Sequence, residues 1–234
     1  MLRKLLMGTT TLALALSLAG CQDTTTDTET EDATETTTSE EATGTDVVSL
    51  HDPIRVDEEE KAIYLHTEVN GDVLNQGTQH GVVYTEGGND DVSLFLSHVE
   101  PEEIHDGLIQ LGAEAGNNLV MDDLDLPEGE GKEVEGTALD ITISWEGQDE
   151  MPFSGVLVSD NAGIANPDFR FGGHLEANNE LDTGCTICLY SCPIGIISNA
   201  AVPTDEFSDL EVTADADALP ADGEAVTFKI QIAE

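Results

Sequence analysis

Three cysteines gathered near the C-terminal end of the chain are the residues best suited to chemistry. Cys185, Cys188 and Cys192 follow the spacing Cys-x2-Cys-x3-Cys-Pro, and the 234-residue chain has one other cysteine, Cys21. Structural cysteines scatter through a core, whereas clustered thiols bind a common centre or react with one another. The spacing therefore predicts a site, and it leaves the reaction open.

A metal ion or an iron–sulfur cluster is the first chemistry that this spacing favours. The run resembles the last three cysteines and the proline of a bacterial ferredoxin motif, but the place of the first cysteine is taken by Asp182. One chain therefore cannot supply four thiolates to a cluster. Three thiolates could hold three irons of a cubane, or a zinc ion, with Asp182, a histidine, water or a second protomer completing the site.

The histidines give a weaker signal because all six are scattered along the chain. His174, eleven positions before Cys185, is the one candidate ligand among them. The others are expected on the surface or hydrogen-bonded in the core; they are His51, His66, His80, His98 and His105.

Thiol chemistry without a metal is the alternative. In an exported protein disulfides persist, so Cys185 and Cys188 could form a redox pair, or Cys188 and Cys192 a structural disulfide. Either pairing leaves one thiol free. A thioredoxin-like role would need a parallel sheet and a helix around the Cys-x-x-Cys, and neither is indicated. No hydrolase, nucleotide-binding or metalloprotease motif occurs, so no enzyme class is assigned.

Residues 1–20 have the pattern of a targeting segment. Arg3 and Lys4 precede a short apolar run, which ends in Leu-Ala-Gly-Cys at Cys21. That tetrapeptide resembles a bacterial lipobox, which implies cleavage before Cys21 and acylation of its thiol. Several acyl chains would anchor the mature protein to the extracytoplasmic face of the cell membrane.

The composition then divides the rest of the chain into two parts. Residues 22–46 consist almost entirely of Thr, Asp, Glu, Ser and Ala, with no basic or aromatic residue, which predicts a disordered tether. Residues 47–234 are long enough for one domain with a substantial core. Its apolar positions predict a mainly β or α+β domain with many strands and one helix.

The expected elements follow from alternating apolar positions and turn signals. A hairpin around 57–60 and a helix from Pro101 to Leu111 are the clearest. The remaining expected strands are 80–84, 92–96 after the loop Gly-Gly-Asn-Asp, 139–145, 153–158, 169–171, 194–197 and 226–232.

Acidic residues dominate the charge. The chain has 49 acidic and 7 basic residues, a formal charge of −42, and loss of Arg3 and Lys4 with the leader takes it to −44. Such a field repels nucleic acid and anionic headgroups. The pattern favours a surface adapted to salt over a calcium site, because the acidic runs lack the spacing and the glycine of an EF-hand loop.

The sequence resembles the YdjY-type domain family across the whole folded part. The resemblance rests on His80-Gly-Val-Val, on the segment 103–113, on Gly184-Cys-x-x-Cys-x-x-Ser-Cys-Pro-x-Gly195 followed by Ser-Asn-Ala, and on Leu-Pro-Ala-Asp-Gly before the last strand. It implies a bacterial secreted or membrane-tethered domain, whose cysteine-rich members are described as iron–sulfur proteins. It implies no reaction or substrate.

Together these features predict a lipid-anchored extracytoplasmic protein whose cysteine loop binds a metal or an iron–sulfur cluster, with electron transfer to a partner protein as one role. An accessory or ligand-binding lipoprotein, with its cysteines closing a loop by a disulfide, is the alternative, and a hydrolase is a more distant one.

Overall fold

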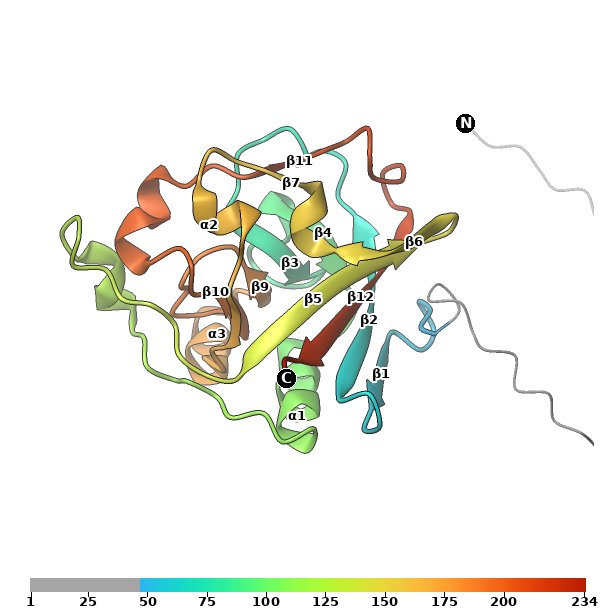
Figure 1. Cartoon of the computed structure of the whole chain (residues 1–234), viewed down its shortest axis with the longest axis horizontal. Helices are drawn as coiled ribbons and strands as arrows, with labels where there is room; N and C mark the ends of the chain where they lie inside the picture. Colours follow the sequence, from blue (N-terminus) through green and yellow to red (C-terminus); the bar gives the residue numbers. More distant parts are fainter. Residues whose placement is uncertain (1–46) are drawn as a thin grey trace, which may run out of the picture. The chain divides into compact units, whose positions relative to one another are not determined.

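A computed structural model describes residues 47–234, and the expected leader, the Cys21 anchor and the 22–46 tether lie outside them. Eight strands form a closed barrel in the order β2, β12, β5, β8, β10, β9, β3 and β4, with β4 pairing back to β2 (Figure 1). Closure leaves no long free edge, which suits a strand-rich domain of this size. The expectation of a strand-rich domain is confirmed.

The barrel strands are β2 (Ala62–Val69), β3 (His80–Tyr84), β4 (Ser93–Ser97), β5 (Ala138–Trp145), β8 (Phe169–Phe171), β9 (Cys185–Cys188), β10 (Ile197–Asn199) and β12 (Ala225–Ile232). Two further strands extend the sheet, β1 (Ile54–Asp57) against β2 and β6 (Gln148–Pro152) against β5. A separate small pair joins β7 (Leu157–Val158) to β11 (Thr213–Ala214).

Helices are more numerous than the sequence predicted. The expected one is α1 (Pro101–Gln110), whose Gly107 lies close against Ile63 of β2. The structure adds α2 (Ala162–Ala165) and α3 (Leu175–Leu181), and α3 lies beside α1. Helix α3 was not predicted, because it is short and contains two asparagines, which are weak helix formers. It ends at Asp182, which has a left-handed conformation. Short 3-10 helices occupy 90–92, 121–125, 153–156 and 204–209.

Two expected strands were placed wrongly, for identifiable reasons. The 153–158 segment is mostly a single-turn helix, because its buried side chains, Phe153 and Val156, are three apart rather than alternating. The 194–197 segment is largely loop, and β10 begins only at Ile197. The carbonyl oxygens of Ile194 and Gly195 face side chains outside the sheet, those of Asn178 and His174. They therefore do not hydrogen-bond to a neighbouring strand of the described domain.

Aromatic packing fills the centre of the core. The ring of Phe153 meets Phe95 and Phe228 edge-to-face, with centroids 5.9 and 5.0 Å apart, and it stacks on Phe169 at 6.1 Å. Aromatic pairs in these arrangements stabilise the fold by more than the burial of their apolar surface alone. The three cysteines belong to the same buried cluster. The site predicted from the sequence therefore lies in the packed core and not in an exposed loop.

Nearly all the Lys and Arg side chains of residues 47–234 form ion pairs with carboxylates. Arg55, Lys132, Arg170 and Lys229 each contact a carboxylate, which leaves most acidic side chains without a basic partner in this part of the chain. The distribution agrees with a surface that relies on solvent cations for screening.

Candidate metal centre

Cys185 and Cys188 begin and end β9, and a bulge places them on one side. Residues three apart in a regular strand point to opposite faces. Here Cys185 pairs with Val83 and Ile187 with Val82, so Thr186 is an extra residue without a counterpart on β3. The insertion reverses the alternation between the two cysteines, as β-bulges near functional sites often do.

A second irregularity on β3 brings His80 to the same place. His80 pairs with Cys188 and Val82 with Ile187, which leaves Gly81 as an extra residue on β3. A Cβ at Gly81 would lie 3.1 Å from the carbonyl oxygen of Ile187, so glycine suits this close approach of the two backbones.

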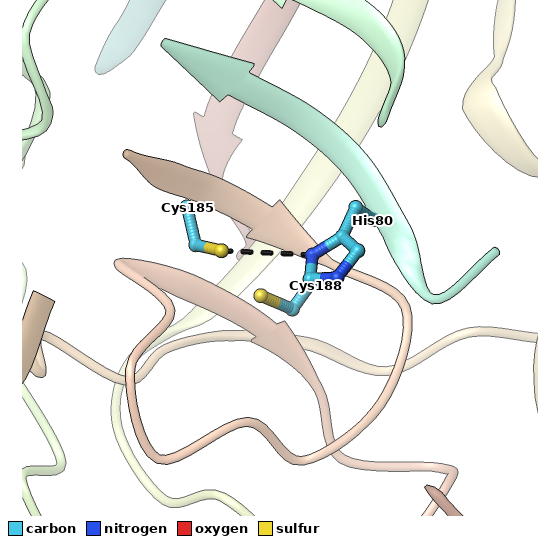
Figure 2. A group of neighbouring side chains, drawn as sticks. All are labelled: His80, Cys185 and Cys188. Carbon is cyan, nitrogen blue, oxygen red and sulfur yellow. Dashed lines mark hydrogen bonds between the residues drawn. The ribbon is translucent and has the colours of Figure 1, made fainter. Parts of the chain in front are cut away.

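The result is a compact group of three ligand atoms. Those of His80, Cys185 and Cys188 all lie within 4.8 Å of one another, and Cys185 Sγ is 3.6 Å from His80 Nδ1. Figure 2 shows both sulfurs and the imidazole turned toward one another across the ends of β3 and β9. Both cysteines are fully buried and His80 is partly exposed. A thiolate, a thiol and an imidazole so arranged could bind a metal ion.

The two thiols differ in acidity. A hydrogen bond with the Cys188 thiol, helped by His80, holds the pKa of Cys185 well below its ordinary value. Hydrogen bonds with Cys185 and Cys192, together with complete burial, raise the pKa of Cys188 well above it. Of the two thiols, Cys185 is therefore the one that gives up its proton more readily.

Cys192 lies near this group without joining it. Its thiol is buried next to Cys188 but falls outside the set of ligand atoms that lie within 4.8 Å of one another. All three cysteines are free thiols in the described part of the chain. The loop that carries Cys192 passes close to Cys188, since a Cβ at Gly195 would lie 2.9 Å from its sulfur.

The structure places His174 and Asp182 away from the cluster. His174 precedes α3, accepts a hydrogen bond from the Leu119 amide at Nε2, and has Nδ1 3.4 Å from the Gly195 carbonyl oxygen. Burial lowers its pKa, so the ring is neutral and serves to hold the loop. Asp182 is exposed at the end of α3.

Buried side-chain amides fix the backbone around the thiols. Asn178 of α3 donates to the carbonyl oxygens of Cys185 and Ile194, both at 2.8 Å. Asn199 of β10 donates to the Leu189 carbonyl, and its own side-chain oxygen accepts from Asp168 and Ala201. Buried hydrogen bonds of this kind help to hold a site in one arrangement.

Comparison with known proteins identifies the family. Residues 54–231 match the YdjY domain family, and the chain belongs to it. Over 193 residues, covering 81% of this chain and 83% of the other, the sequence is 35% identical to "Uncharacterized protein YdjY" of Escherichia coli strain K12. No solved structure matches the chain. Within residues 47–234 no helix is long and apolar enough to cross a membrane.

The acidity difference predicts a single low-pH thiolate in the metal-free protein. Ultraviolet absorbance at 240 nm, which reports thiolates, should show one ionisation below the ordinary cysteine pKa of about 8.5. Cys185→Ser should remove that step and Cys192→Ser should keep it. If the absorbance of the wild-type protein rises only above about pH 8.5, the expected difference in acidity between Cys185 and Cys188 is contradicted.

Proposed function

We propose that this YdjY domain is a lipid-anchored extracytoplasmic metal-binding protein, in which His80, Cys185 and Cys188 hold one thiolate-preferring ion. The observation that supports it most strongly is the convergence of three ligand atoms within 4.8 Å from two strands that are distant in sequence. Zinc is the reference ion, because imidazole and thiolate are its usual ligands. A redox-active ion at the same position would support electron transfer to a partner protein.

The spacing of the ligands favours one ion over an iron–sulfur cluster. With Zn–S near 2.3 Å and Zn–N near 2.1 Å, ligand atoms around a tetrahedral ion lie about 3.5–3.8 Å apart. The 3.6 Å between Cys185 Sγ and His80 Nδ1 falls in that range. A cubane binds each thiolate through a different iron and needs wider spacing. Cys192 also stands outside the group, so a cluster would have to recruit it by rearrangement.

Three protein ligands leave one coordination position. Structural zinc sites in proteins are closed by four protein ligands, whereas sites that act on a substrate keep one position for water or a ligand. Three ligands with a fourth position left over therefore favour a site that exchanges a small ligand or an ion over a purely structural one.

Metal titration of the reduced protein tests the proposal. We expect one equivalent of Zn²⁺ or Co²⁺, with Co²⁺ producing thiolate charge-transfer absorption. Cys185→Ser, Cys188→Ser and His80→Ala should each weaken binding by about 100-fold or more, since each removes a direct bond. Asp182→Asn serves as the control and should bind within about fivefold of wild type, because its exposed side chain lies outside the group of ligand atoms. Cys192→Ser removes no direct bond to the ion and should weaken binding less than the three ligand variants do.

The outcomes of that titration separate the alternatives. Equal loss in all three cysteine variants, with iron and sulfide in the purified protein, would replace the single ion by a cluster. A protein that takes up no metal and, when purified without reductant, titrates with one free thiol would instead support the disulfide alternative, since the Cys188 thiol lies against both other cysteines. Affinity should also rise about tenfold per pH unit near pH 8, because binding must displace the Cys188 proton.

The anchor is a separate part of the proposal and rests on the Leu-Ala-Gly-Cys sequence ending at Cys21. Cys21→Ala should remove fatty-acid labelling and release a folded, metal-competent protein from the membrane fraction. Labelled Cys21→Ala protein would contradict the lipobox interpretation without touching the metal site.

A further inference from the structure

The loop between β3 and β4 brings one more polar side chain to the thiols. Asn89 Nδ2 lies 3.3 Å from Cys185 Sγ. We infer that Asn89 is a positioning residue of this site, which donates an N–H to the Cys185 thiolate and thereby sets how tightly the site holds its ion. The effect of Asn89 on ion affinity rests on the proposed function. The hydrogen bond to Cys185 rests on the observed contact.

The loop reaches Cys185 because of an unusual strand connection. β3 and β4 are adjacent and parallel, although only residues 85–92 join them. Parallel neighbours normally need a crossover of about a dozen residues or more. Here the chain must return along the length of β3, and it does so past the segment that leads into Cys185.

Backbone hydrogen bonds attach this loop to that segment. The amide of Gly88 donates to the Asp182 carbonyl at 2.8 Å, and the amide of Asn89 donates to the Thr183 carbonyl at 3.3 Å. The contact between Asn89 and Cys185 therefore follows from main-chain pairing and does not depend on the side chain alone.

Two glycines permit this close approach. A Cβ at Gly87 would lie 2.5 Å from Gly184 Cα, and a Cβ at Gly184 would lie 2.8 Å from Gly87 Cα. Gly184 also has a φ of +69°, which disfavours other residues. The far side of the loop is held by Asn70, whose amide donates to the carbonyls of Asp90 and Ser93.

A neutral amide is well suited to this position. An N–H donor stabilises a thiolate, and outer hydrogen bonds of this kind commonly tune metal ligands. The contact contributes to the lowered pKa of Cys185, after the larger effects of Cys188 and His80. The next two residues are Asp90 and Asp91, and a carboxylate at position 89 would repel the thiolate instead.

Asn89→Asp tests the inference, because it keeps the shape, removes the donor and adds a charge. Asn89→Leu removes the donor without charge, and Asn179→Asp on the exposed face of α3 is the matched charge control. Two quantities are measured on each folded protein. One is the thiolate titration at 240 nm in the metal-free state, and the other is Zn²⁺ affinity by competition with a chelator.

We expect both Asn89 variants to move the Cys185 ionisation to higher pH and to weaken Zn²⁺ binding by about 10–100-fold, with Asp the stronger. The control should match wild type. Unchanged titration and affinity in both variants would overturn the inference while wild-type binding still supports the proposed function. If wild type binds no Zn²⁺, the proposed function fails, and the inference that Asn89 sets the affinity for the ion fails with it.

Discussion

The alternation of side chains along a pleated strand is the constraint on which this site depends. Cys185 and Cys188 are three residues apart, and a regular β9 would send them to opposite faces. The extra residue Thr186 on β9, matched by the extra Gly81 on β3, reverses the alternation and aligns His80 with both sulfurs. Because the barrel is closed, these strands cannot slip in register to relax the irregularity.

Contacts from α3, from His174 and from the 85–92 connection support that irregular pair of strands. Asn178 of α3 holds the carbonyls at both ends of the cysteine loop, and His174 lies against the same loop at Gly195. The 85–92 connection packs against the residues just before Cys185, where Gly87 contacts Gly184. These buried polar contacts hold the backbone that carries the thiols, and burial with the neighbouring thiols raises the pKa of Cys188.

Local patterns in the sequence predicted much of the barrel and only part of the site. Alternation found the hairpin around 57–60 and the 139–145 strand, and Pro101 with its two glutamates found α1. The spacing of the cysteines identified a site with two of its three ligand candidates. It could not separate Cys192 from the other two, because the position of the bulge decides which sulfurs converge.

His80 was beyond the reach of local patterns. It lies 105 residues before Cys185, and only the long-range pairing of β3 with β9 joins them. Its sequence signals are its place in the His80-Gly-Val-Val block that resembles the family and the glycine that follows it in a strand, which is typical of a bulge or of close backbone approach. His174, nearer in sequence, instead supports the loop, and Asp182 lies at an exposed helix end.

X-ray absorption spectroscopy of the metal-loaded wild-type protein tests the central claim most directly, because it counts the atoms bound to the ion. With one equivalent of Zn²⁺, the account predicts two sulfur neighbours at about 2.3 Å, one imidazole nitrogen at about 2.0–2.1 Å and one further light atom. A third sulfur, a shell of oxygen and nitrogen alone, or an iron–iron distance in protein purified with its native metal would contradict it.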